Sequence, residues 1–319
     1  MFGFLLKVLK IRIGFKIMKI IIKRLFIPLT ILSLIGIAFY TFNIKKNKEK
    51  TNDNVLILTT VRPLTIALNE ICKDVSNISI KEITNGYLGS HSCFHDFSLT
   101  TKQVNDIEKS SLVVINGVSF EPFLKNIKNK NLIDSSENIE IIENKKEKNP
   151  WIWMSIQNYI KQISNIFSKF VILKEYSNLN PENRNKISEN FTKYKENLEK
   201  IYHEWKTKFE KFKGYKVLTI SNEFDYLLKE FDLEPIHLIE EHSHGGLSPK
   251  NISDSIKTIE DGQYKFYLSS SDKYCKIFEQ TGAKCVKLDL IKSQDKTSYI
   301  EESEKNLNLL LENLNEFYK

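Results

Sequence analysis

Four of the six histidines lie in two short segments of the chain. His91 and His95 are four residues apart with Cys93 between them, and His242 and His244 flank one serine ahead of a glycine pair. Imidazole nitrogens and thiolates are the ligands that zinc prefers in proteins. Paired histidines on a glycine-flanked loop therefore predict a metal-capture element, and a solvated polar loop is the alternative interpretation.

The other polar clusters predict less chemistry. His203 is expected on the polar side of a long helix and His237 beside a strand, both in structural roles. The adjacent acids Glu240-Glu241 and Glu301-Glu302 are typical of a solvated surface. No serine–histidine–acid or cysteine–histidine order stands out for nucleophilic catalysis, and no phosphate-binding G-x-x-x-x-G-K-[ST] or dinucleotide-binding G-x-G-x-x-G motif occurs in the sequence. The sequence therefore predicts a protein that is not an enzyme.

The net charge of +7 over 319 residues comes from the first 50 residues. That leader carries 11 Lys or Arg and one acid, whereas the rest carries 36 basic and 39 acidic side chains, a net charge of −3. A body without excess positive charge gives no support to a nucleic-acid partner.

The leader, residues 1–50, also contains an uncharged apolar run from Leu25 to Phe42, with Met18 as an alternative start. As a helix these 18 residues span about 27 Å, close to the thickness of a bilayer core. Lysines and an arginine precede the run, which favours an exported body. We expect a signal anchor or a cleaved signal, with the body on the periplasmic side of the inner membrane.

Strand and helix patterns alternate along the body. Apolar runs at 54–59 and 111–116, each beside an amphipathic stretch, predict βαβ units, and 121–130 is expected to be helical. Strands are predicted again at 216–220, 235–239, 265–268 and 284–288, before a final helix over 299–317. The fold class is therefore α/β, with two lobes that each hold a mostly parallel sheet flanked by helices.

A long helix is expected to join these lobes. Phe191, Tyr194, Leu198, Ile201 and Trp205 recur at spacings of three and four, which places one apolar stripe on the helix. The expected division is 52–180 for the N-terminal lobe, 181–213 for the linking helix and 214–319 for the C-terminal lobe.

The four cysteines are Cys72, Cys93, Cys275 and Cys285, and they allow three disulfide connectivities. An exported body permits disulfides, but reduced buried thiols agree equally well with the sequence.

Several motifs in a fixed order resemble a known family. In the first half these are the SCFHDF segment at 92–97, the SLVVING segment at 111–117 and the FEPFL segment at 120–124. In the second half they are FDYL at 224–227, Ser248-Pro249 and the strand that ends at Leu288-Asp289. From about residue 54 to the C-terminus, the chain resembles the metal-specific solute-binding proteins of ABC transporters, of the zinc- and manganese-uptake type.

The resemblance implies a metal held between two lobes by histidines and a carboxylate. His95 and Asp289 match two of the family's ligand positions. Trp151 and Asn222 stand where the family has its other two histidines. An indole cannot ligate a metal, and an amide oxygen is a weak ligand for zinc. His242 and His244 are the possible substitutes, and Trp151, Asn222, His91 and Glu241 are possible cleft-lining residues.

The resulting prediction is a monomeric substrate-binding component that carries Zn²⁺, or Mn²⁺, to the permease of an ABC transporter at the membrane. The alternative is a binding-fold protein that has lost its metal and serves as an envelope interaction or scaffold protein.

Overall fold

The computed structural model describes residues 54–84, 97–127, 131–144, 147–239 and 248–318. The predicted membrane segment lies outside the described residues, as do Cys93 and five of the predicted site residues, namely His91, His95, Glu241, His242 and His244. Among the residues that are described, no helix is both long and apolar enough to cross a bilayer.

The N-terminal half of the described chain is built on a four-stranded parallel sheet. Its strands are ordered β2-β1-β3-β4. They are β1 (Val55–Thr59), β2 (Ile78–Glu82), β3 (Leu112–Ile115) and β4 (Leu132–Asp134). β1 and β3 are the two central strands, and their buried Val, Ile and Leu side chains form nearly continuous apolar runs, as expected where both faces of a sheet are covered.

The C-terminal half contains a second parallel sheet of four strands, ordered β10-β9-β7-β8. They are β7 (Lys216–Thr219), β8 (Glu234–His237), β9 (Phe266–Ser269) and β10 (Lys284–Lys287). A short antiparallel hairpin of β5 (Glu143–Asn144) and β6 (Glu147–Lys148) lies between the two sheets in sequence. The prediction of an α/β fold with two parallel sheets is confirmed.

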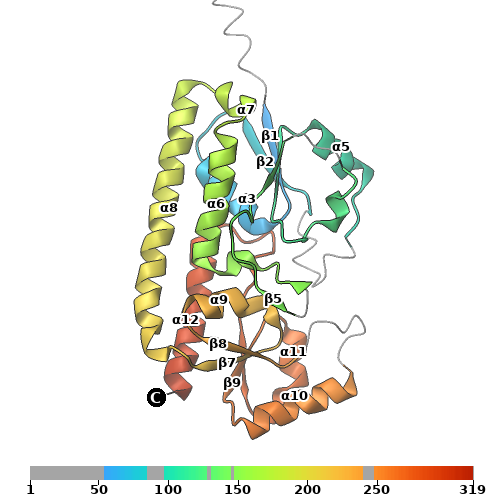
Figure 1. The fold of residues 1–319 in the computed structure, drawn as a ribbon, viewed down its shortest axis with the longest axis vertical. Coiled ribbons are helices and arrows are strands. Elements are labelled where there is room, and N and C mark those ends of the chain that lie inside the picture. Colours follow the sequence, from blue (N-terminus) through green and yellow to red (C-terminus); the bar gives the residue numbers. More distant parts are fainter. Residues whose placement is uncertain (1–53, 85–96, 128–130, 145–146, 240–247, 319) are drawn as a thin grey trace, which may run out of the picture. The chain divides into compact units, whose positions relative to one another are not determined.

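Helices flank both sheets (Figure 1). In chain order they are α3 (Arg62–Ile71), α5 (Thr101–Lys109), α6 (Ile156–Phe170), α7 (Lys174–Ser177), α8 (Pro181–Phe209), α9 (Asp225–Glu230), α10 (Pro249–Asp261), α11 (Asp272–Ile277) and α12 (Tyr299–Phe317). Most begin at a side-chain cap, such as the reciprocal capping box of Thr100 and Gln103 on α5.

The long helix α8 occupies most of the 181–213 range in which a long helix was expected. Its 29 residues span about 43 Å. Asn180 caps its first turn, and Tyr194, Leu198, Trp205 and Phe209 form the buried stripe. α8 packs against α3, α6 and α12, so it touches helices of both halves (Figure 1).

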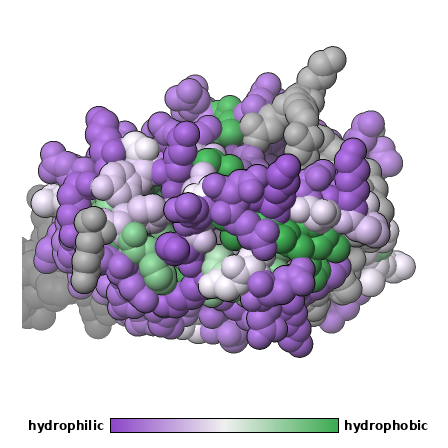
Figure 2. All heavy atoms as spheres, turned by 90° about the horizontal axis from the view of Figure 1, so that it is seen from below, coloured by the Kyte–Doolittle hydropathy of each residue, from purple (hydrophilic) through white to green (hydrophobic). Residues whose placement is uncertain are grey.

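One apolar core continues through both halves, and residues 54–319 form one compact unit. Figure 2 views the molecule from the end where α10 lies in Figure 1, and hydrophilic side chains predominate on that face. The division into two lobes at 180 and 214 stays a prediction.

The fold differs from the sequence prediction in several places. Residues 121–130 were expected to be helical, but only a 3-10 turn, η2 (Pro122–Leu124), forms in the described part. The strand β2 and the helix α6 were not predicted. β2 alternates isoleucine with polar side chains at the edge of the sheet, so its apolar signal is short.

The cysteines are now partly assigned. Cys275 on α11 and Cys285 on β10 form a disulfide with a Cα–Cα distance of 5.4 Å. Cys72 is a free, buried thiol, and burial raises its pKa to about 12. A thiol in this state is protonated and inert.

Candidate functional site

Three segments that are distant in sequence meet where the two halves face each other. The side-chain amide of Asn149 donates to the carbonyl of Asn222 at 2.7 Å. The indole nitrogen of Trp153 donates to the carbonyl of Leu290 at 2.9 Å. Asn222 follows β7 and Leu290 follows β10, so both lie past the carboxyl ends of parallel strands, where ligands of α/β folds usually bind.

Trp151 fills part of this junction with its indole. The residue is 4% exposed and packs edge-on against Phe120 and Trp153, with ring centroids 6.2 and 5.2 Å away. The Lys292 ammonium lies 5.8 Å from the centroid of its indole, in cation–π range. Trp151 is therefore packed on the rings of Phe120 and Trp153, and its place in a cleft stays a prediction.

Asn222 is also buried, in the 3-10 turn η5 (Asn222–Phe224). Its neighbour Glu223 accepts a hydrogen bond from the Ser270 hydroxyl at 2.6 Å. Burial raises the pKa of Glu223, against the lowering effects of Ser270 and of the Lys292 charge. Ser270 follows β9, so the carboxyl ends of three strands of the second sheet supply polar groups to this region.

Asp289, the predicted carboxylate ligand, lies just past β10, and its side chain is 38% exposed. Its backbone is fixed by Asn306 of α12, which donates to the Asp289 carbonyl at 2.7 Å and accepts from the Asp289 amide at 2.8 Å. One carboxylate oxygen accepts from the amide of Ile291 at 2.6 Å. The other lies 3.0 Å from the ammonium of Lys296.

The first sheet contributes a buried carboxyl group near the same junction. Glu121 accepts from the Thr60 hydroxyl at 2.6 Å, and from the amides of Asn116 and Gly117 at 2.7 and 3.1 Å. Burial raises its pKa to about 8, although these three donors act to lower it. Asn116 in turn donates to the carbonyl of Pro150 at 3.0 Å, which connects Glu121 to the segment that carries Trp151.

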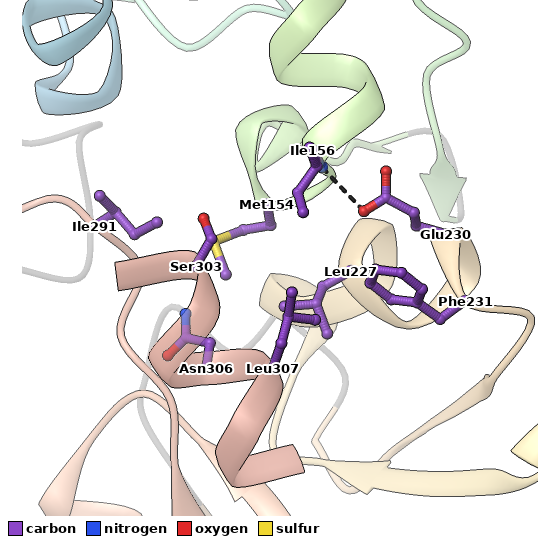
Figure 3. Close-up of a pocket in the computed structure, with 9 residues that line it drawn as sticks. All are labelled: Met154, Ile156, Leu227, Glu230, Phe231, Ile291, Ser303, Asn306 and Leu307. Carbon is purple, nitrogen blue, oxygen red and sulfur yellow. Dashed lines mark hydrogen bonds between the residues drawn. The ribbon is translucent and has the colours of Figure 1, made fainter. Parts of the chain in front are cut away.

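A small cavity lies among α6, α9 and α12, and it is large enough for only about one water molecule (Figure 3). Glu230 lies at its edge and accepts from Ser155 Oγ at 2.7 Å and from the amides of Ile156 and Gln157 at 2.9 and 2.7 Å. A carboxylate from α9 thus caps the amino end of α6. The cavity is a packing feature between the halves, because apolar side chains such as Met154 and Leu307 line most of it.

Among the other polar residues with a predicted role, the structure confirms the prediction for three and contradicts it for one. His203 is exposed on α8, and His237 contacts the buried carboxylate of Asp225 at 2.6 Å, so both have the structural surroundings expected of them. Glu301 is exposed, as predicted. The prediction for Glu302 is wrong, because that residue is buried and contacts two lysine ammonium groups.

Two lysines beside Asp289 were not predicted. Lys292 and Lys296 follow Asp289 in the chain. The Lys292 ammonium lies over the Trp151 indole, and the Lys296 ammonium contacts the Asp289 carboxylate. Nothing in the sequence separates them from solvent-exposed lysines except their spacing of four residues. Among the described residues, no group of three or more His, Cys, Asp or Glu side chains is placed to hold a metal.

The chain matches a known protein family over most of its length. Residues 57–313 match the model of the family described as zinc-uptake complex component A, periplasmic. The chain belongs to this zinc-uptake family. The resemblance found in the sequence is therefore confirmed, and so is the prediction of a non-enzyme, because the family consists of transport components.

The chain is also similar to individual curated proteins and to solved structures. The metal ABC transporter substrate-binding lipoprotein SloC of Streptococcus mutans is 25% identical over 255 residues, covering 72% of this chain and 76% of SloC. The manganese ABC transporter substrate-binding lipoprotein PsaA of Streptococcus mitis is 25% identical over 218 residues, covering 61% and 67%. The structure of the laminin-binding protein Lmb of Streptococcus agalactiae matches with a TM-score of 0.69 at 19% identity, covering 82% and 99%.

Proposed function

We propose that the chain captures a divalent metal ion where its two halves meet and delivers it to the permease of an ABC transporter. The observation that carries the proposal is the place of Asp289. The chain belongs to the zinc-uptake family. Its Asp289 carboxylate lies past the end of the parallel strand β10, beside the junction of the 149–153 and 222–224 segments.

The proposed ligands are His95 and Asp289, with His242 and His244 in place of the missing histidines. This set combines imidazole nitrogen with carboxylate oxygen, which suits Zn²⁺ and also accommodates Mn²⁺. The family description names zinc and the PsaA relative is named for manganese, so both ions belong in the test. The alternative of a metal-free scaffold protein gains no support from the comparisons.

The proposed location is the outer side of the cytoplasmic membrane, with the body acting as a monomer. The SloC and PsaA relatives are named lipoproteins, and the Cys275–Cys285 disulfide agrees with an oxidising compartment. In this chain the apolar run 25–42 is the proposed anchor. Two lobes, bounded by the linking helix over 181–213, are the proposed units between which the ion is held.

Calorimetric titration of the chelator-treated, full-length chain with Zn²⁺ and with Mn²⁺ tests this function. We expect one ion per chain with a Kd tighter than about 10 μM, which corresponds to roughly −7 kcal/mol. His95→Ala, Asp289→Ala and the double variant His242→Ala/His244→Ala are each expected to weaken binding at least about tenfold. Asp254→Ala, an exposed aspartate on α10, is the matched control. If neither Zn²⁺ nor Mn²⁺ binds, the proposal is contradicted.

A further inference from the structure

The carboxylate of Asp289 is already engaged by a cation that belongs to the chain. The Lys296 ammonium lies 3.0 Å from one Asp289 oxygen and 3.2 Å from the carboxylate of Glu302. The Lys296 side chain is only 17% exposed. Together with the Ile291 amide, this ammonium occupies both oxygens of the carboxylate that the proposed function assigns to the metal.

The position of Lys296 is fixed from both halves of the molecule. Arg62, at the start of α3 after β1, donates from its Nε to the Lys296 carbonyl at 2.7 Å. The Arg62 guanidinium also lies 4.0 Å from Glu82 at the end of β2. The backbone of Lys296 is therefore held by Arg62 of the N-terminal half, while its ammonium contacts Asp289 and Glu302 of the C-terminal half.

Glu302 offers the Lys296 ammonium a second carboxylate if the ammonium leaves Asp289. Glu302 lies on α12 and already contacts Lys296, and Lys305 contacts the other Glu302 oxygen at 3.0 Å. Lys296 can thus leave Asp289 while it keeps its contact with Glu302. Lys292 adds a nearby positive charge, which is attracted by both Glu223 and Asp289.

We infer that Lys296 is a tethered competitor of the metal ion. In the metal-free chain its ammonium neutralises Asp289, and an incoming cation displaces it toward Glu302. The competitor lowers the affinity of the site and therefore favours release of the ion to the permease. This inference rests on the proposed function, because it requires Asp289 to be a metal ligand.

Titration of full-length Lys296→Gln with Mn²⁺ and Zn²⁺ tests the competition. Removing one unit charge roughly 6 Å from a divalent ion in water-like surroundings changes its affinity by about tenfold, so the variant is expected to bind about tenfold more tightly than the natural chain. Lys296→Arg keeps the charge and is expected to bind as the natural chain does. Lys305→Gln, which changes a lysine that contacts Glu302 but not Asp289, is expected to stay within about twofold.

The outcomes separate this inference from the proposed function. Equal or weaker binding by Lys296→Gln, in a natural chain that does bind metal, overturns the competition and leaves the proposed function intact. Binding by both proteins, with the tighter binding in Lys296→Gln, supports both. Failure of both proteins to bind overturns the proposed function and this inference with it. Thermal unfolding of each variant shows that any change in affinity comes from a folded chain.

Discussion

Tyr159 and Tyr299 stack with ring centroids 3.6 Å apart and ring planes 15° from parallel. Tyr159 lies on α6 and its hydroxyl donates to the carbonyl of Pro63 at 2.9 Å, whereas Tyr299 opens α12 and donates to the carbonyl of Trp153 at 2.6 Å. Both side chains are fully buried. This pair joins the N-terminal and C-terminal halves, and its Tyr299 hydroxyl contacts the segment that carries Trp151.

Removing the Tyr299 ring is expected to destabilise the chain strongly. Tyr299→Ala should lower the free energy of unfolding by about 3–5 kcal/mol, because it leaves a cavity in the core. Tyr299→Phe keeps the stack and loses one hydrogen bond, and it should cost about 1 kcal/mol. Urea denaturation measures both values, and Tyr215→Phe, at an exposed tyrosine, is the control. Equal losses for the two Tyr299 variants would show that the ring contributes nothing.

Glu230 predicts how stability depends on pH. Burial raises its pKa from 4.5 to about 7 in the folded chain. Between these values the unfolded chain has lost the proton and the folded chain retains it, so the free energy of unfolding falls as pH rises from about 4.5 to 7. The fall attributable to this group is on the order of 3 kcal/mol.

Glu230→Gln cannot titrate and should remove this share of the fall. Glu121, whose pKa is raised to about 8, contributes to both proteins and cancels in their difference. The measurement is the free energy of unfolding of both proteins at several pH values from 4.5 to 8. Parallel pH profiles would mean that the Glu230 carboxyl titrates normally.

Two glycines with left-handed backbone offer a matched pair of substitutions. Gly117 has φ +83° and Gly214 has φ +77°. A methyl group at 117 would overlap the Asp134 carboxylate and the Ser136 hydroxyl, whereas nothing lies within 4 Å of one at 214. Gly214→Ala should cost about 1–2 kcal/mol from the backbone alone, and Gly117→Ala should cost at least about 2 kcal/mol more. Similar melting temperatures for the two variants would refute the overlap.

The disulfide between Cys275 and Cys285 closes a loop with a sequence separation of 10. The chain-entropy estimate for a loop of this size is about 2.7 kcal/mol. Cys275→Ser/Cys285→Ser is expected to lower the free energy of unfolding by about this amount, and a reductant should destabilise the natural chain but not the double variant. A reductant effect that persists in the double variant would contradict this assignment.

The sequence was sufficient for most of the fold, because its signals are local. The apolar runs at β1, β3 and β7 and the stripe on α8 follow directly from residue periodicity. Over the described residues 121–127 the expected helix does not form, because Glu121 instead contacts Thr60, Asn116 and Gly117, which only the folded chain brings to it.

The site was less accessible to sequence reasoning. The resemblance marked Trp151, Asn222 and Asp289, and the structure brings the segments that carry them together through the Asn149 and Trp153 hydrogen bonds. The contact between Lys296 and Asp289 depends on a loop whose backbone is held by Arg62, 234 residues earlier in the chain. Pairings over such distances leave no mark in local composition. The histidine positions His95, His242 and His244 remain predictions.

Anomalous diffraction from crystals grown with Zn²⁺, and separately with Mn²⁺, tests the metal site most directly. We predict one anomalous peak per chain for Zn²⁺, at about 2.0–2.2 Å from an Asp289 carboxylate oxygen and from imidazole nitrogens of His95 and of the 242–244 loop. The Lys296 ammonium should then have moved from Asp289 to Glu302. A peak remote from Asp289, or Asp289 still paired with Lys296 in crystals saturated with either metal, would contradict the metal-binding function proposed for this site.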